Sequence, residues 1–306
     1  MRNTFAQTIT QLAQTNDKIV LLSGDIGNRL FDELKSRTTK RFFNCGVAEA
    51  NMMSVASGLA LNGFRPFVYT ITPFTTIRCL EQIKIGAAYH NAPLTIVGTG
   101  SGLSYASLGP THHSLEDISS IKAIPNIDIY APWDPPSLKM VLYQVLSKKK
   151  PAYIRIGKKG EEVIKLTEIN GIDNEGHCVK PGTSCCIIAF GTIVDNAISA
   201  AKKLESSGVS VAVYVSSKIK PLPTKLISHL ATTYRNIVSV EEHSKIGGIG
   251  ESVGSYLSNK YPSCNFHAIG THDFFLSKIG TKHYAREQLG IGIDSIVNHT
   301  NNMLKI

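Results

Sequence analysis

Short apolar runs alternate with amphipathic stretches along the first half of the chain. Each run is apolar over a few residues and is bounded by Gly, Pro or polar side chains, which is typical of buried strands. Between the runs, apolar residues recur at helical spacing. The predicted strands are residues 18–24, 41–45, 65–71, 93–100, 127–132 and 151–157, and the predicted helices include residues 30–36, 75–90, 115–124 and 135–149. This order predicts an α/β domain with a mainly parallel sheet and helices on both faces.

A polar segment with several glycines, residues 158–182, interrupts this order. We expect the boundary between two domains there, because such a composition is typical of connecting segments. The alternation then resumes as far as residue 270 and is followed by two amphipathic helices. The sequence therefore predicts two α/β domains, at residues 1–165 and 176–306, each with a mainly parallel sheet.

One predicted helix carries a carboxylate at the head of its apolar stripe. Counting from Glu49 at helical spacing reaches Met52, Met53, Ala56 and Ala60, which we expect to face a core. Glu49 should point the same way, and a buried charge is costly unless something pairs with it. Either this carboxylate caps the first turn of its own helix, or it is held for a partner that is not protein.

The composition excludes several classes of protein. The chain has a net charge of +9, but its Lys and Arg residues are scattered apart from residues 147–151, so we expect no nucleic-acid partner. The charge suits phosphorylated or other anionic small molecules equally well. The six cysteines form no CxxC pair, which favours reduced thiols over a metal site. No apolar run or leader-like segment predicts a membrane span or export, so a cytoplasmic location is the default expectation.

Five segments of the chain together resemble one family. They are "FFNCGVAEANMMSVASGLAL" at residues 42–61, "FVYTITPFTTIRCLEQI" at 67–83, "LGPTHHSLEDISSIKAIPNIDIYAP" at 108–132, "PAYIRIG" at 151–157 and "VEEHSKIGGIGESV" at 240–253. Their order and spacing resemble the C-terminal half of transketolase, and most of all the small subunit of split, two-chain transketolases. The resemblance implies a pyrimidine-binding domain and a C-terminal domain of a thiamine diphosphate enzyme that transfers a two-carbon ketol unit between sugars.

The resemblance assigns cofactor-binding roles to several residues. Glu49 corresponds to the glutamate that hydrogen-bonds N1′ of the cofactor's aminopyrimidine and takes part in proton transfer, and Phe74 to the ring that stacks on this heterocycle. The other positions that correspond to the surroundings of the cofactor are Asp25, Val47, Ile71, Arg78 and Gln82. For Arg78 and Gln82, a structural contact with Glu81 or another neighbour is an equal alternative.

The resemblance also assigns substrate-binding roles. His112 corresponds to a histidine that contacts the carbonyl region of the donor and helps proton transfer, and His113 stands next to it. Taken alone, this pair on a loop is also compatible with solvent-exposed histidines or a metal site. Arg155 corresponds to an arginine that binds the substrate phosphate, where a planar guanidinium suits the anion. Arg2 is expected to do the same from the N-terminal segment.

The chain departs from the family in the acceptor site. Transketolases usually carry an aspartate before "GPTH" that recognises an acceptor hydroxyl, and an earlier histidine that contacts the acceptor phosphate. Leu108 and Gly100 stand at these two positions here, and neither side chain can form a hydrogen bond. We therefore expect an acceptor that is not a standard aldose phosphate, unless Ser104, Ser107 or His113 takes over the hydroxyl contact.

The chain also lacks the "GDG…N" motif with which thiamine diphosphate enzymes hold the diphosphate and Mg²⁺; the segment "SGDIGN" at residues 23–28 does not match it. We therefore expect no metal ligands in this chain. The expected partner is an N-terminal transketolase subunit that carries the motif, in an α2β2 assembly built on a self-dimer of this chain. Two alternatives stay open: the β subunit of a 2-oxoacid dehydrogenase E1-type enzyme, and a non-catalytic stabilising subunit. The "GPTHH…LEDI…IPN" run favours transketolase.

Overall fold

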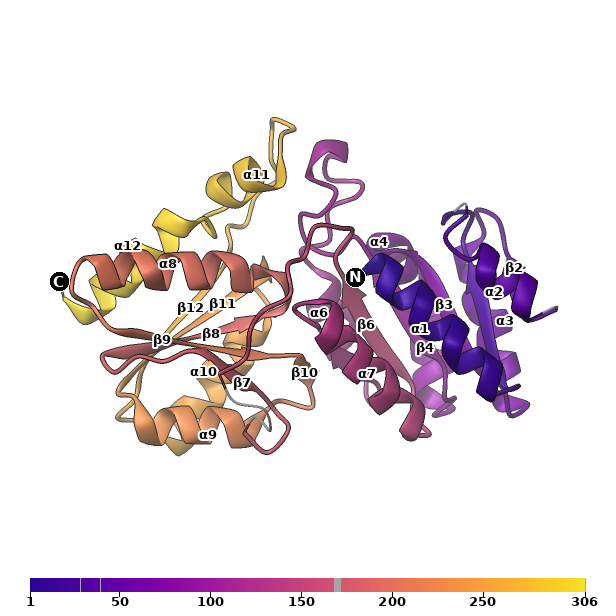
Figure 1. Cartoon of the computed structure of the whole chain (residues 1–306), viewed down its shortest axis with the longest axis horizontal. Helices are drawn as coiled ribbons and strands as arrows, with labels where there is room; N and C mark the ends of the chain where they lie inside the picture. The colour runs from indigo at the N-terminus through magenta and orange to yellow at the C-terminus, as the bar shows by residue number, and fades with distance from the viewer. Residues whose placement is uncertain (28, 39, 168–171, 306) are drawn as a thin grey trace.

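The structure is a computed structural model that describes residues 1–27, 29–38, 40–167 and 172–305. Figure 1 shows two α/β units side by side, with the first half of the chain in indigo to magenta and the second in orange to yellow. The strands form a seven-stranded and a five-stranded sheet. This arrangement confirms the predicted two-domain α/β fold with mainly parallel sheets. In the described part of the chain, no helix has both the length and the apolar character needed to cross a membrane.

The seven-stranded sheet has the order β10-β5-β6-β4-β3-β1-β2. Its strands are β1 (Ile19–Ser23), β2 (Phe42–Asn44), β3 (Arg65–Ile71), β4 (Thr95–Thr99), β5 (Asp128–Tyr130), β6 (Ala152–Ile156) and β10 (Lys218–Lys220). The first six pair in parallel, and β10 pairs with β5 in the antiparallel sense. The carboxyl ends of the parallel strands therefore meet at one edge, where α/β folds place their ligands.

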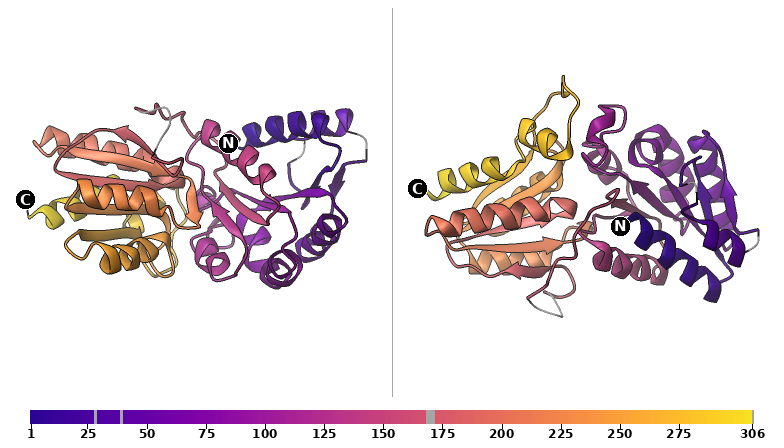
Figure 2. Two further views of the ribbon diagram at one scale, coloured as in Figure 1. Left: turned by 90° about the horizontal axis from the view of Figure 1, so that it is seen from below. Right: turned by 45° about the horizontal axis from the view of Figure 1, so that its top comes forward.

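Helices cover both faces of this sheet, as the view from below in Figure 2 shows. On one face, the apolar side chains of α1 (Arg2–Thr15), α2 (Asp32–Arg37) and α7 (Pro135–Ser147) pack against β1, β3, β4 and β6. On the other face, α3 (Glu49–Leu61) packs against the sheet, and α6 (Asp117–Lys122) lies in the core that continues into the second domain. The predicted single helix at residues 75–90 is broken.

The broken segment consists of four short pieces, α4 (Thr72–Thr75), the 3₁₀ helix η1 (Ile77–Cys79), α5 (Leu80–Gln82) and the π-helix η2 (Ile83–Tyr89). The chain leaves the helical conformation at Thr76, which has φ −112° and ψ −90°. Gly86 then lies so close to Ser57 of α3 that an added Cβ would be 2.6 Å from the Ser57 hydroxyl. The break thus lets the wider π-helix lie directly on α3.

The second sheet has the order β12-β11-β8-β9-β7. Its strands are β7 (His177–Lys180), β8 (Cys185–Phe190), β9 (Val211–Ser216), β11 (Asn236–Ser244) and β12 (Asn265–Thr271), and its helices are α8 (Val194–Ser206), α9 (Thr224–Thr233), α10 (Ile249–Lys260), α11 (Lys282–Gln288) and α12 (Ile293–Leu304). Alternate residues of β8 face two different cores, one with α8 and α12 and one with α9 and α10. The six cysteines all lie within the described residues, and none of them forms a disulfide.

Two strands differ from the sequence prediction. The polar segment 158–182, in which we expected the domain boundary and no strand, contains β7, which pairs antiparallel with β9 at the edge of the second sheet. Residues 218–220 were expected within the second domain, yet they form β10 at the edge of the first sheet. The expected division between residues 165 and 176 lies between β6 and β7, and its middle, residues 168–171, lies outside the described residues.

Candidate active site

The Glu49 carboxylate is buried at the start of α3, close to the carboxyl ends of β1 and β3. The side chain is 4% exposed, and the predicted stripe from Met52 to Ala60 is buried with it. An added Cβ on Gly24, just after β1, would lie 3.4 Å from Cγ of Glu49 and 3.2 Å from Thr70. No side-chain hydrogen bond caps α3. The structure therefore does not support the first alternative, in which Glu49 caps its own helix.

Arg78 of η1 is the protein partner of Glu49. Its Nη1 donates a hydrogen bond of 2.8 Å to Oε2 of Glu49, while the arginine itself stays 44% exposed. Among the described residues Arg78 pairs with Glu49 and not with Glu81, and its expected role at the cofactor stays a prediction. Among the described residues, none donates a hydrogen bond to Oε1 of Glu49. The other oxygen of this largely buried carboxylate is therefore left as a free acceptor.

The side chains of Arg78, Phe74 and His112 lie next to one another. Together with Glu49 they form a row of contacting groups. The guanidinium carbon of Arg78 lies 4.1 Å from the centre of the Phe74 ring, in cation–π contact. The His112 ring meets Phe74 edge-on, with 5.4 Å between the ring centres and an angle of 70°. Tyr105 meets His112 from another side at 5.9 Å. The fold thus brings Glu49, Phe74 and His112 together from three separate segments.

His112 is poised as a neutral imidazole. Burial lowers the pKa of His112, and the charge of His113 lowers it further. Its Nδ1 is 2.9 Å from Oγ1 of Thr111, and Nε2 has no hydrogen-bond partner among the described residues. A half-buried ring with one nitrogen fixed and the other free can exchange a proton with a bound substrate near neutral pH.

The loop that carries His112 is closed by its own backbone. Gly102 and Ser114 exchange two hydrogen bonds, of 3.1 and 3.0 Å, which join the two ends of the loop. Inside it, Nε2 of His113 lies 3.2 Å from the Ala106 carbonyl, and the ring is 7% exposed. The geometry therefore gives His113 a role inside the loop and does not support the expected contact with substrate.

The two positions that depart from the family differ in their surroundings. Gly100 has φ +72°, and an added Cβ would lie 2.0 Å from the ring of Tyr105, so this ring fills the place of a side chain at position 100. Leu108 is 48% exposed on the 3₁₀ helix η3 (Ala106–Leu108). The loop thus presents an aromatic ring and an aliphatic side chain where the family presents a histidine and an aspartate.

The second domain holds this loop in place through Glu242 of β11. Its Oε1 accepts a 2.8 Å hydrogen bond from the backbone N–H of Leu103, and Nε of Arg286 donates one of 2.5 Å to its Oε2. Burial raises the pKa of Glu242, but the charges of Arg286 and Lys282 outweigh this and bring it down to about 2. The carboxylate therefore stays ionised, and through it the C-terminal domain positions the His112 loop.

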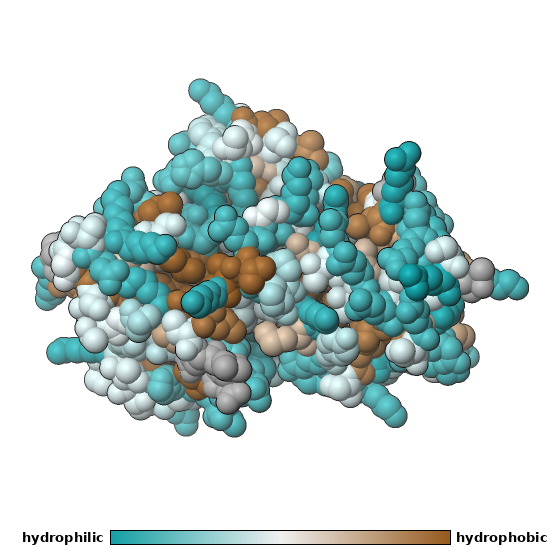
Figure 3. All heavy atoms as spheres, in the orientation of Figure 1, coloured by the Kyte–Doolittle hydropathy of each residue, from teal (hydrophilic) through white to brown (hydrophobic). Residues whose placement is uncertain are grey.

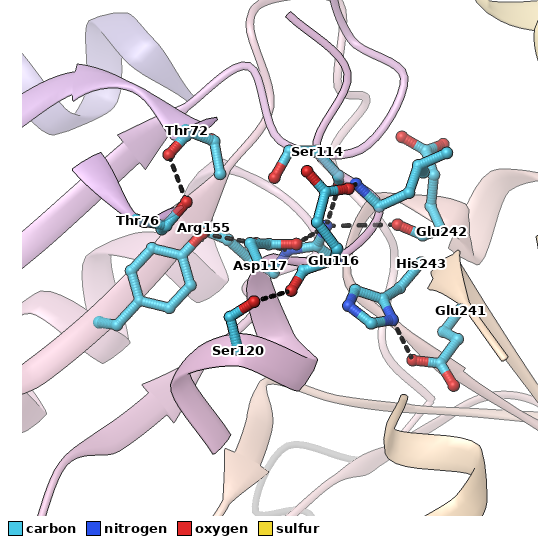
Figure 4. A network of polar contacts seen from close by, with 12 residues as sticks. Thr72, Thr76, Ser114, Glu116, Asp117, Ser120, Arg155, Glu241, Glu242 and His243 are labelled. Atoms are coloured by element: carbon cyan, nitrogen blue, oxygen red, sulfur yellow. Dashed lines mark hydrogen bonds and ion pairs between the residues drawn. The ribbon is translucent and has the colours of Figure 1, made fainter. Parts of the chain in front are cut away.

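Arg155 lies inside the contact between the two domains, as Figure 4 shows. It is 5% exposed; its Nε and Nη2 donate hydrogen bonds of 2.9 and 3.1 Å to Asp117 of α6. Nη2 also donates to the carbonyl oxygens of Ser114 and Glu242, each at 3.2 Å. Nε and Nη2 are thus engaged within the chain, whereas Nη1 has no hydrogen-bond partner among the described residues. This geometry favours a role in joining the domains over the expected role in binding a substrate phosphate.

The other expected residues lie around this site with fewer contacts. Asp25 follows β1 with φ 42° and accepts a 3.1 Å hydrogen bond from Asn44. Val47 is 78% exposed just before Glu49, whereas Ile71 at the end of β3 is buried. Nε of Arg2 at the start of α1 is buried and has no hydrogen-bond partner among the described residues. Gln82 follows in α5, and its role stays a prediction.

Four residues of this region carry contacts that the sequence interpretation did not assign. Tyr105 is the aromatic residue of an otherwise Gly- and Ser-rich loop, which was a signal for a special position. Asp117 and Glu242 stand in the quoted "LEDI" and "VEEH" segments, but no local pattern shows that they face Arg155 and the His112 loop. The sequence around Arg286 does not indicate its contact, because its partner Glu242 is 44 residues away along the chain.

Comparison with known proteins identifies the class to which this fold and site belong. The model of the transketolase pyrimidine-binding domain matches residues 1–160, and that of the transketolase C-terminal domain matches residues 174–292. The chain therefore belongs to the transketolase family, a family of transferases, and carries these two domains.

Within this family the chain is similar to subunits of two-chain enzymes. It is 31% identical to a subunit of the apulose-4-phosphate transketolase of Phocaeicola vulgatus, over 84% of this chain and 83% of the relative. It is 29% identical to the 6-deoxy-6-sulfo-D-fructose transketolase subunit SqwH of Clostridium sp., over 97% and 92%. A solved structure described as a split gene transketolase, inactive beta4 tetramer, has a TM-score of 0.87 at 29% identity and covers 99% of this chain and 97% of its own. The resemblance found in the sequence is confirmed.

Family membership implies thiamine diphosphate, and the residues present fit one end of that cofactor. Glu49 has a carboxylate oxygen without a hydrogen-bond donor among the described residues, and its partner Arg78 also contacts the aromatic ring of Phe74; together these groups suit a flat heterocycle with a protonated ring nitrogen. For the diphosphate end, no group of three or more His, Cys, Asp or Glu side chains that could hold a metal occurs in the described part of the chain. The site thus fits the aminopyrimidine alone.

Proposed function

We propose that this chain is the pyrimidine-binding subunit of a two-chain, thiamine diphosphate-dependent transketolase that moves a two-carbon ketol unit between sugars. The observation that carries the proposal is the row of Glu49, Phe74 and His112, with a free oxygen of Glu49 at one end and a free nitrogen of His112 at the other. The relatives named as transketolase subunits support it. Transfer from hydroxypyruvate to an aldose by the assembled enzyme tests it.

Each residue of the row has a distinct task in this proposal. The bound cofactor supplies a carbon nucleophile that carries the ketol unit. Glu49 binds the aminopyrimidine and shares a proton with its ring nitrogen, and Phe74 orients the heterocycle by stacking. His112, neutral and held by Thr111, exchanges a proton with the oxygen of the sugar carbonyl through Nε2. Glu49 and His112 would thus supply two acid–base groups, one for the aminopyrimidine and one for the sugar.

A partner chain completes the site in this proposal. The partner is an N-terminal transketolase subunit with a "GDG…N" motif, which supplies the ligands of Mg²⁺ and binds the diphosphate. Exposed apolar side chains of α3, of the turn before it and of the broken segment η1–η2 suit an interface with further transketolase chains, because large apolar side chains exposed in one region are typical of interfaces. They are Val47, Val55, Leu61, Ile77, Ile85 and Tyr89. The face in Figure 3 is mostly hydrophilic and carries several apolar patches. We propose an α2β2 assembly located in the cytoplasm.

We predict that the isolated chain binds thiamine diphosphate weakly, because it offers contacts to the aminopyrimidine and none to the diphosphate. Titration calorimetry with cofactor and Mg²⁺ should give a dissociation constant above the micromolar range for this chain alone. Adding the partner chain should bring it below this range. Submicromolar binding without a partner would contradict the division of the site between two chains.

We further predict that ribose 5-phosphate is a poor acceptor for the assembled enzyme. Leu108 offers no hydrogen bond to an acceptor hydroxyl, and a hydroxyl that loses water without gaining a partner costs roughly 1–3 kcal/mol. A deoxygenated, keto-modified or nucleotide-linked sugar should fit better. Steady-state comparison of acceptors checks this prediction. A kcat/KM for ribose 5-phosphate of about 10⁴ M⁻¹s⁻¹ or higher, as in efficient enzymes, would contradict it.

A further inference from the structure

A cavity of about 680 Å³ lies between the segment that follows β6 and the helix α8. Its walls come from residues 159–165, from the end of β7, from α8 and from Trp133, which follows β5. The volume is in the range of small-molecule sites, about 300–1,000 Å³. Neither Glu49 nor Phe74 nor His112 lines this cavity, so it is separate from the candidate active site.

One side of the cavity is apolar. Ile164, Val179 and Ile198 are half-buried there and pack against the core of the second domain, to which Trp133 belongs as well. The backbone N–H of Ile164 donates a 3.0 Å hydrogen bond to the buried carboxylate of Asp134, next to Trp133. This bond holds the segment after β6 in place, so the apolar side is formed without a ligand.

The other side of the cavity is rich in lysines. Three of the carboxylates that line the cavity already have a cation of this chain as their partner; they are Glu161, Asp195 and Glu205. By contrast, Lys159, Lys165 and Lys202 form no ion pair among the described residues, and only Glu162 stands against them as an unpaired lining carboxylate. The cavity therefore has an excess of positive charge, which favours an anionic ligand.

Two charged groups of the cavity also belong to the network that holds the His112 loop. Lys282 lines the cavity, and its Nζ lies 3.8 Å from Oε2 of Glu242. Asp195 accepts hydrogen bonds of 2.9 and 3.0 Å from Arg286, which in turn donates to the same oxygen of Glu242. Because Glu242 binds the backbone of the loop, a charge that enters the cavity acts on the carboxylate that positions this loop.

We propose that this cavity binds a small organic anion with an apolar part, and that its occupation weakens ketol transfer. The apolar side takes up the apolar part and the unpaired lysines bind the anionic group, a chemistry that nucleotides and fatty acids share. The bound anion draws the ammonium of Lys282 away from Glu242, which loosens the hold of that carboxylate on the His112 loop. The binding does not depend on the proposed function, whereas the effect on transfer rests on it.

Trp133 is the single tryptophan of the chain and makes the binding measurable. The probe is 8-anilinonaphthalene-1-sulfonate, a flat apolar molecule with one sulfonate. Titration of the full chain should quench the emission of Trp133 by energy transfer to the probe. The same titration is made with N-phenyl-1-naphthylamine, the neutral molecule without the sulfonate. The dissociation constant of the neutral molecule divided by that of the probe then measures the contact with the anionic group.

Matched lysine variants separate the cavity from the rest of the surface. Lys165→Met and Lys202→Met should each lower this ratio about 5- to 20-fold, as loss of a charge-assisted contact does. Lys203→Met removes a neighbouring charge of α8 that is paired with Asp294 and does not line the cavity, so it should leave the ratio within about twofold. An unchanged ratio in both cavity variants, or an equal fall in the Lys203 variant, would overturn the proposal.

Displacement of the probe distinguishes the sources of the ligand. AMP and octanoate each join an anionic group to an apolar part, which is a flat base in the first and an aliphatic chain in the second. Displacement by AMP assigns the cavity to nucleotides, and displacement by octanoate assigns it to acyl chains. If neither displaces the probe at millimolar concentration, the cavity binds the dye alone and the proposed ligand site is wrong.

The effect on the reaction is measured with the assembled two-chain enzyme. The probe should lower kcat/KM for ketol transfer from hydroxypyruvate, and Lys202→Met should shift this inhibition to higher probe concentration by the factor by which it weakens binding. Binding without inhibition, or inhibition that the variant does not shift, would overturn the coupling through Lys282. An assembled enzyme without any ketol transfer would refute the proposed function, while the fluorescence titration would still decide on the binding site.

Discussion

Replacing Glu49 with glutamine should reduce the turnover of the assembled enzyme by a factor on the order of 10²–10⁴, the usual cost of losing a proton-sharing group. The amide keeps the shape of the side chain and can still contact Arg78 through its oxygen. Its other position becomes an NH₂ donor, which faces the place where Oε1 now offers a free acceptor. The measurement is steady-state ketol transfer from hydroxypyruvate by the reconstituted two-chain enzyme.

A matched variant tests whether the effect belongs to this carboxylate. Glu81 stands on α5, shortly after Arg78 in the chain, and is exposed to solvent. Glu81→Gln removes one negative charge as well, and it should keep at least half of the wild-type rate. Thermal unfolding should show that both variants are folded. Turnover of the Glu49 variant within threefold of wild type would refute the assignment of this residue.

Replacing Arg155 with methionine should destabilise the isolated chain by about 3–5 kcal/mol, because it leaves Asp117 buried and unpaired. The lost contacts include the carbonyl oxygens of Ser114 and Glu242, which lie on both sides of the contact between the domains. Denaturation by urea measures this loss of the free energy of unfolding. The effect should appear without any cofactor or partner chain.

The exposed pair of Arg37 and Glu33 provides the control for this prediction. Its side chains are 54% and 57% exposed, so Arg37→Met should cost no more than about 1 kcal/mol. Two further results decide between the roles considered for Arg155. A loss of stability supports its role in joining the domains. Near wild-type stability with a raised KM for a phosphorylated substrate would instead restore the role expected from the family resemblance.

Apolar periodicity predicted most of the fold. Most parallel strands of both sheets are apolar runs, because helices cover both faces of such strands, whereas the edge strands β2 and β12 are only partly buried. The strands β7 and β10 were missed because they are short edge strands with polar residues, and only their neighbours make them strands. The break at Thr76 was missed because its helical pieces keep the apolar spacing of one helix.

The sequence predicts a residue of the site only where a reactive side chain interrupts a local apolar pattern. Glu49 stood out because a carboxylate headed an apolar stripe, and its burial follows from that stripe. The partners of Arg155 could not be read in this way, because Asp117 is 38 residues away along the chain and belongs to a helix between two domains. The contact of Tyr105 with His112 likewise depends on how the loop after β4 folds back on itself.

The strand β10 makes the two halves of this chain inseparable in a practical sense. Ala131, just after β5, donates a 2.7 Å hydrogen bond to the carbonyl of Ser217, and the ammonium of Lys220 donates to the carbonyls of Lys122 and Ile124 at the end of α6. A fragment that stopped after β6 would expose the edge of β5 as a row of unpaired backbone groups, which is a template for self-association. The smallest piece that could be moved into another protein is therefore the pair of domains, and a chimera has to exchange residues 218–220 together with the sheet they protect.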